Sequence, residues 1–158
     1  TFVDSYRKLT QLQPAQIEKV TLSDLVSTVC MLYSKVKWHV NIEDKQTKVS
    51  ADSGLMRQVL VNIVKNAVEA GARNIDLRVS MDNDLAQMLV SNDAPPIPPE
   101  VAREIFVPFF TTKSTGSGIG LPLARQMMLA QDGNLSLAET PVVGYHTTFV
   151  LVMKLLRK

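Results

Sequence analysis

The strongest constraint on the fold is an amphipathic segment that begins near Ser53 and continues to about Ala70. Its apolar residues recur at steps of three and four positions, which places them on one face of a helix. Asp52 or Ser53 stands at the expected N-cap, and Gly71 supplies a C-terminal stop. A helix of this length with one apolar face needs a sheet or other helices to cover that face.

Runs with the alternation of β-strands lie on both sides of this helix. Asn74 to Met81 and Leu85 to Ser91 follow it, separated by the turn-forming residues 82–84. Before it, residues 38–42 alternate, and Thr47 to Ala51 is predicted to be their hairpin partner. The other predicted elements are helices at 2–12, 25–32 and 121–130 and strands at 17–20, 134–138 and 147–152. Together these elements predict an α/β sandwich with mostly antiparallel strands.

Composition narrows the class of protein. The chain has 158 residues, of which 46% are hydrophobic and 20% charged, so it is long enough for one domain with a real core. A net charge of +2 gives no support to nucleic-acid binding. The single cysteine, Cys30, cannot form an internal disulfide, which fits a reducing cytoplasm, and no apolar run is long enough to cross a bilayer. We expect a cytoplasmic domain. Anchoring of the parent protein in the inner membrane is compatible with this sequence and is left open by it.

Asn62 and Asn66 lie four positions apart and therefore on one face of the long helix. Two interpretations are open. Their carboxamides bond to neighbouring backbone, since unpaired buried polar groups are costly. Alternatively, Asn66 offers its amide oxygen to Mg²⁺, which prefers oxygen ligands and takes few of them from protein when phosphate is present.

A loop of 92–120, rich in proline and glycine, lies between two predicted elements, and such long loops are usually functional. It contains a run from Ile105 to Lys113 with three phenylalanines, and then Gly116, Gly118 and Gly120 directly before a helix. Glycines let backbone amides approach a phosphate, and a helix N-terminus favours anions. The glycines follow no strand of a βαβ unit and lack the ending of a P-loop, so they fit neither of those nucleotide sites.

Taken in order, these segments resemble the motifs of sensor histidine kinases. The similar segments are Gln58–Ala70 (asparagine box), Val90–Pro98 (first glycine box), Phe106–Lys113 (phenylalanine box), Gly116–Leu121 (second glycine box) and Gly144–Phe149 (closing strand). The resemblance covers roughly residues 14–156, and several motifs in the right order are more specific than any one of them. Residues 1–13 resemble the end of the dimerisation and phosphoacceptor helix, and 14–158 the catalytic ATP-binding domain.

The resemblance implies a Bergerat fold, a two-layer α/β sandwich with a mixed sheet of about five strands on three helices and a flexible ATP lid. It implies ATP and Mg²⁺ as cofactors and transfer of the γ-phosphoryl group to a histidine on a separate dimerisation domain. It implies that Asn66 coordinates Mg²⁺ with the help of Asn62, and that Lys113 contacts the phosphates. The remaining implied contacts to the nucleotide come from Asn92, Ile97, Phe110, Gly116, Gly118, Gly120 and Leu121.

Three residues depart from the family pattern. Asn92 stands where the family usually has the aspartate that accepts a hydrogen bond from the adenine amine. Its amide oxygen is still an acceptor, without the charge assistance worth about 1 kcal/mol. Ala94 and Pro96 replace glycines, and Pro96 stiffens the loop.

These departures keep a second hypothesis open, a degenerate nucleotide-binding or partner-docking module that does no chemistry. A chaperone-like or repair ATPase is a third, weakened because Asn62 stands where ATPases of the superfamily carry a glutamate. The resemblance implies that the acceptor histidine lies upstream, on the dimerisation domain, and His39 and His146 are predicted to be structural. The expected partners are ATP, the dimerisation domain and a response regulator, with no nucleic acid and no direct membrane contact.

Overall fold

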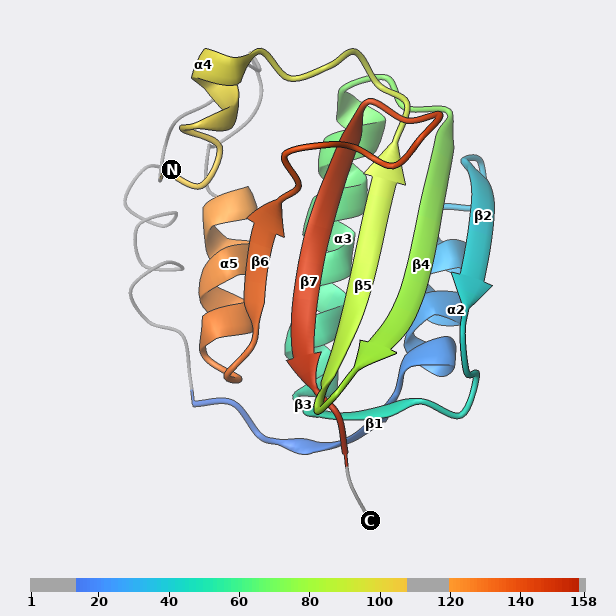
Figure 1. Ribbon diagram of the computed structural model, residues 1–158, viewed down its shortest axis with the longest axis vertical. Coiled ribbons are helices and arrows are strands. Elements are labelled where there is room, and N and C mark those ends of the chain that lie inside the picture. Colours follow the sequence, from blue (N-terminus) through green and yellow to red (C-terminus); the bar gives the residue numbers. More distant parts are fainter. Residues whose placement is uncertain (1–13, 108–119, 157–158) are drawn as a thin grey trace.

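Two layers make up the molecule, a twisted sheet and a layer of helices on one of its faces (Figure 1). The computed structural model describes residues 14–107 and 120–156, so the helix predicted for residues 2–12 lies outside the described part. The elements are β1 (Glu18–Thr21), α2 (Leu22–Leu32), β2 (Lys37–Ile42), β3 (Lys48–Ala51), α3 (Ser53–Glu69), β4 (Asn74–Asp82), β5 (Leu85–Asn92), α4 (Pro99–Ala102), α5 (Gly120–Leu129), β6 (Asn134–Leu137) and β7 (Thr147–Lys154).

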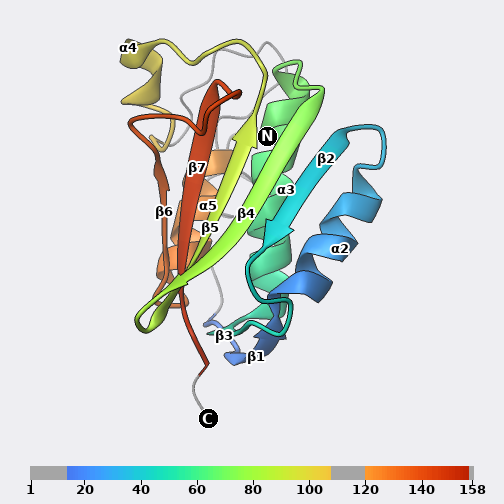
Figure 2. The same ribbon diagram turned by 45° about the vertical axis from the view of Figure 1, so that its right-hand side comes forward.

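The main sheet has five strands in the order β2-β4-β5-β7-β6. Strand β2 runs parallel to β4, and the other neighbouring strands are antiparallel. Helices α2, α3 and α5 cover one face, while the opposite face carries no helix among the described residues (Figure 2). The predicted α/β sandwich with a mixed five-stranded sheet on three helices is therefore confirmed.

The predicted hairpin between residues 38–42 and 47–51 is wrong. Strand β3 pairs with β1 instead, in a separate two-stranded sheet with Val20 opposite Val49. Strand β2 pairs with β4, with Trp38 opposite Ile75. Alternation of apolar residues specifies that a segment is a strand with one buried face, but the partner is chosen by packing elsewhere in the chain. Val49 and Ala51 of β3 are buried in the same core as Val20 of β1.

The long helix α3 forms as its sequence predicts. The Asp52 carboxylate accepts a hydrogen bond from the Leu55 N–H at 3.0 Å and so caps its first turn. Gly71 ends it with a φ of 101°, a conformation that side chains disfavour. The apolar face of α3 is fully covered, through Met56, Val59, Leu60, Ile63, Val64 and Ala67. It packs against the inward-facing residues of the sheet and against α5.

Among the residues that the structure describes, no helix is both long and apolar enough to span a lipid bilayer.

Candidate nucleotide site

Helix α3 is joined to the beginning of α5 through Asn62. The Asn62 Nδ2 donates to the Gly120 carbonyl at 2.9 Å, across 58 positions of sequence. Its Oδ1 accepts a bond from Gln58 Nε2 at 2.7 Å. Because a carbonyl oxygen has two lone pairs, the bonds among the described residues leave one acceptor position of Asn62 Oδ1 open. The contact places Asn62 beside Gly120, the last of the three glycines predicted to lie near the phosphates.

Asn66 follows Asn62 by one helical turn, so the two side chains share a face of α3. Both side chains are half-buried. The backbone of Asn66 ends the helix normally, since its carbonyl accepts the Ala70 N–H at 3.1 Å. For Asn62, the structure shows a bond to backbone, which was the simpler of the two interpretations of this pair.

Asn92 is the last residue of β5, where it lies opposite Ile75 of β4 and Thr147 of β7. Alternation along the strand gives it the same face as Met88 and Val90, the face covered by the helices. The residue is only 5% exposed. Its Oδ1 accepts the Ala94 N–H at 3.0 Å.

His146 completes this end of the sheet. Its N–H donates to the Asn92 carbonyl at 3.0 Å, and its Nδ1 lies 2.9 Å from the Ala94 carbonyl. The structural role predicted for His146 is thus supported by its contacts, which hold residues 92–94 against the start of β7.

The Asp93 side chain binds the start of the neighbouring strand, β4. Its Oδ1 accepts the Arg73 N–H at 2.8 Å and the Asn74 N–H at 3.0 Å, and its Oδ2 accepts from Asn74 Nδ2 at 2.8 Å. Burial raises the pKa of Asp93, but the hydrogen bonds from Asn74 and Arg73 outweigh it and hold the pKa at about 2. The carboxylate is therefore committed to β4 and does not replace an aspartate at position 92.

Of the predicted apolar contacts, Ile97 is half-buried against the core and Leu121 is 9% exposed at the start of α5. Phe106 meets Phe149 edge to face, with ring centroids 6.5 Å apart at 81°. The Arg125 guanidinium lies 5.2 Å from the centre of the Phe106 ring. This cation–π contact was not predicted from the sequence. The predicted residues Phe110, Lys113, Gly116 and Gly118 lie outside the described part of the chain.

The donor groups present suit a magnesium ion held mainly by phosphate and water. In residues 14–107 and 120–156 no three His, Cys, Asp or Glu side chains form a metal-binding group. The two asparagine side chains of α3 supply neutral amide oxygens, which are hard ligands of the kind that Mg²⁺ accepts. The described residues therefore do not supply a complete set of protein ligands for a metal ion. They can supply one or two ligands to a Mg²⁺ ion that is otherwise held by a triphosphate and water.

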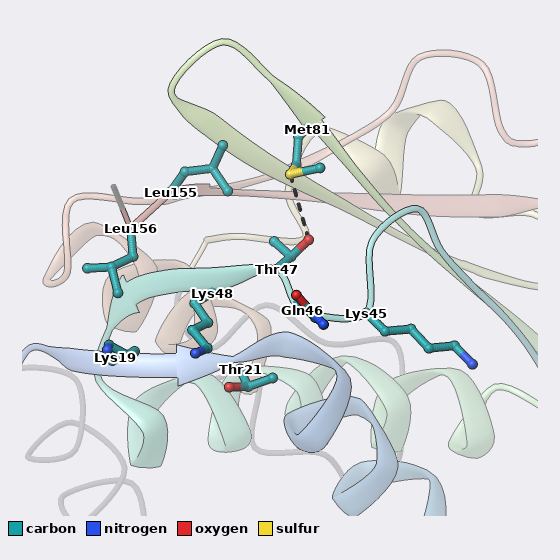
Figure 3. Close-up of a pocket in the computed structure, with 9 residues that line it drawn as sticks. All are labelled: Lys19, Thr21, Lys45, Gln46, Thr47, Lys48, Met81, Leu155 and Leu156. Carbon is teal, nitrogen blue, oxygen red and sulfur yellow. Dashed lines mark hydrogen bonds between the residues drawn. The ribbon is translucent and has the colours of Figure 1, made fainter. Parts of the chain in front are cut away.

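A separate groove of about 820 Å³ lies beside the two-stranded β1–β3 sheet (Figure 3). Its lining is Lys19, Thr21, Lys45, Gln46, Thr47, Lys48, Met81, Leu155 and Leu156. The lining contains three lysines, no carboxylate and none of the predicted site residues. Strand β5 ends with Asn92 at one end of the sheet, and β1 and β3 lie at the other end (Figure 1). This basic groove is thus distinct from the candidate nucleotide site.

Comparison with known proteins identifies the family and supports the fold. Residues 51–157 match the family model described as histidine kinase-, DNA gyrase B- and HSP90-like ATPase. The chain belongs to this family. Within the family, the similar proteins are sensor histidine kinases. The signal transduction histidine-protein kinase AtoS of Escherichia coli (strain K12) is 30% identical over 148 residues, which are 88% of this chain and 24% of AtoS.

The sensor histidine kinase GlrK of the same organism is 35% identical over 136 residues, 78% of this chain and 29% of GlrK. The chain thus spans about a quarter of the length of these relatives. Among solved structures, the nucleotide-free catalytic domain of histidine kinase ThkA is 26% identical, with a TM-score of 0.78 over 88% of this chain and 95% of that one. The fold is therefore that of a histidine kinase catalytic ATP-binding domain.

A further structure shows histidine kinase ThkA in complex with the response regulator TrrA. It is 23% identical, with a TM-score of 0.80 over 97% of this chain and 46% of that one, and at this identity it supports the fold alone.

Proposed function

We propose that the chain binds Mg-ATP and transfers the γ-phosphoryl group to a histidine on a separate dimerisation domain of the same protein. The observation that carries the proposal is the 2.9 Å bond from Asn62 on α3 to Gly120 at the start of α5. It joins the two segments from which the family builds its nucleotide site. A phosphate placed there lies at the beginning of α5, and the N-terminal end of a helix favours negative charge.

In this proposal Asn66 supplies the amide oxygen to Mg²⁺, and Asn62 assists through its open lone pair while it holds Gly120. The metal, when bound, neutralises charge on the phosphates. Ile97 and Leu121 offer apolar surface to the nucleotide, and Asn92 meets the base. The motifs alone support the remaining proposed contacts. These are contacts of Lys113, Gly116 and Gly118 with the phosphates and an apolar contact of Phe110 with the nucleotide.

The same residues favour phosphoryl transfer over hydrolysis. At position 62 the chain has a neutral carboxamide, which has no proton-accepting group for activating water. Positioning and charge neutralisation then supply most of the catalysis, as is usual for phosphoryl transfer. The acceptor histidine and the response regulator that receives the phosphoryl group are proposed from the relationship to sensor kinases.

The test is calorimetric titration of the chain with a non-hydrolysable ATP analogue, with and without Mg²⁺. We expect binding that depends on Mg²⁺ and that weakens in Asn66→Ala, while Asn41→Ala, an exposed residue of β2, leaves it unchanged. In the longer protein that includes the acceptor helix, Asn66→Ala and Asn66→Asp should abolish autophosphorylation. Full activity in either variant refutes the role of Asn66.

A second candidate, a docking module without chemistry, is favoured by one observation. Asn92 Oδ1 already accepts the Ala94 N–H, so it offers an adenine amine only the second lone pair of an uncharged oxygen. Absence of binding at millimolar nucleotide favours this candidate, and steady ATP hydrolysis by the isolated chain favours an ATPase instead.

A further inference from the structure

The charged side chains that line the basic groove are all cations. They are Lys19, Lys45 and Lys48, and the lining has no carboxylate. All three lysines are exposed, and none of them forms an ion pair with another described residue. The positive charge of the groove is therefore not neutralised by the part of the chain that the structure describes.

Two of these lysines are close neighbours on the small sheet. Lys48 of β3 lies opposite Thr21 of β1, and Lys19 precedes Thr21 by two residues on the same face. Lys19 and Lys48 are thus diagonal neighbours, a spacing of about 7–8 Å in an antiparallel pair, at which like charges repel each other. Lys45 lies on the segment that joins β2 to β3, further along the groove (Figure 3). An anion bound among these lysines would relieve the repulsion.

The other residues of the lining are apolar or neutral. Met81 and Leu156 are each 37% exposed, and Leu155 is half-buried. Thr21 and Gln46 add neutral hydrogen-bonding groups. The groove volume of about 820 Å³ lies in the range of small-molecule sites. A positive region beside an apolar one suits a small anion that carries an apolar part.

The type of cation indicates the type of anion. The planar guanidinium of arginine matches a carboxylate through two parallel bonds, but the lining has no arginine. An ammonium group acts as a compact point charge. A phosphate monoester has a charge of about −1.5 to −2 at neutral pH and three acceptor oxygens, so it gains more from several separate ammonium groups than a singly charged carboxylate does.

The surroundings of the groove favour a small ligand over a flat anionic surface such as a membrane. Asp82 directly follows Met81, and Asp44 directly precedes Lys45, but neither carboxylate belongs to the lining. A flat surface would meet these aspartates together with the lysines and would be repelled by them. A ligand inside the groove contacts the lysines alone.

We propose that the basic groove binds a small phosphorylated organic molecule, with its phosphate among the three lysines and its apolar part against Met81, Leu155 and Leu156. The site is separate from the candidate nucleotide site, which lies at the other end of the sheet (Figure 1). The proposal therefore stands or falls independently of the proposed function.

The test is an NMR titration of the chain, followed through its backbone amides, with naphthyl phosphate as the probe. The probe should shift the amide signals of the residues that line the groove, and its affinity should fall as salt is added. Naphthoate, which has the same apolar part and a single charge, should bind more weakly, and so should inorganic phosphate. Absence of shifts at the groove with millimolar probe overturns the proposal, and equal binding of naphthoate overturns the assignment to a phosphate.

Lys48→Glu separates binding from stability. It should weaken binding of naphthyl phosphate by about fivefold or more, because it replaces an attraction by a repulsion. The domain itself should become slightly more stable at low salt, since the repulsion with Lys19 is removed. Lys35→Glu makes the same change of charge at an exposed residue outside the groove and should leave binding unchanged.

Unchanged affinity in a folded Lys48→Glu overturns the proposal. If circular dichroism shows that this variant does not fold, Lys45→Glu takes its place with the same expected loss of affinity. Sedimentation of the chain with phosphatidic acid vesicles tests the source of the phosphate. Association that Lys48→Glu abolishes overturns the assignment to a small molecule, whereas absence of association supports it.

Discussion

Replacing Asp93 by asparagine should destabilise the domain in a way that depends on pH. The substitution removes the charge that three donors from Arg73 and Asn74 stabilise. It also places an amide N–H₂ against Asn74 Nδ2, where two donors face each other. At neutral pH both effects act.

The magnitude follows from the pKa of the folded carboxyl. The gap between an ordinary aspartate pKa of 3.8 and the folded value of about 2 sets an upper limit of about 2 kcal/mol at neutral pH. Asp93 is only partly buried, so solvent screening lowers the expected electrostatic contribution to the order of 1 kcal/mol. Because the folded pKa is depressed, the contribution is complete above about pH 4 and is lost as pH falls toward 2. About half of it is left at pH 3.

Urea denaturation of the unaltered chain and of Asp93→Asn at pH 7 and pH 3 measures this difference. We expect the stability gap to be larger at pH 7 than at pH 3 by about half of the electrostatic contribution. Asp132→Asn is the control, because that exposed carboxylate has only a 3.5 Å contact with Lys154 and should change stability little at either pH. A gap for Asp93→Asn that is equal at the two pH values refutes the reasoning.

Three further substitutions test packing, capping and charge, each by denaturation at neutral pH. Gly133→Ala brings a Cβ to 2.6 Å from the Val152 carbonyl and should cost about 1–3 kcal/mol, whereas Gly54→Ala, in the first turn of α3, should not destabilise. Asp52→Ala removes the acceptor for both Leu55 and Gln16 and should cost about 1–2 kcal/mol; a loss below a few tenths contradicts the cap. Lys48→Glu places a carboxylate on the strand face that carries Lys19 and should stabilise by about 0.5 kcal/mol at low salt, an effect that high salt should remove.

Local patterns predicted the elements whose signals are complete within a short segment. Helix α3 carries its cap, its apolar face and its glycine stop within the segment from Asp52 to Gly71, and all three appear in the structure. The turn between β4 and β5 was equally visible, since Asn83 takes a φ of 55°, which asparagine tolerates better than most residues.

Local patterns do not determine which strands pair with each other. The parallel pairing of β2 with β4 and the pairing of β3 with β1 both join segments that are not neighbours along the chain. Part of the candidate site likewise depends on contacts that local patterns do not specify. Motifs predicted which residues form the site, but the bond between Asn62 and Gly120 and the bond from the Ala94 N–H to Asn92 Oδ1 are contacts that no spacing reveals.

The pairing of β3 has a consequence for the order in which the domain can form. Val49 bridges to Leu155, and the Leu156 N–H donates to the Lys48 carbonyl at 3.0 Å, so the edge of the small sheet is completed by residues far downstream. During synthesis β3 leaves the ribosome long before these residues do. Until they arrive, one edge of β3 has unpaired N–H and C=O groups, which are a template for pairing with another nascent chain. Truncation before Leu155 should therefore raise aggregation during expression even though the candidate nucleotide site loses no residue.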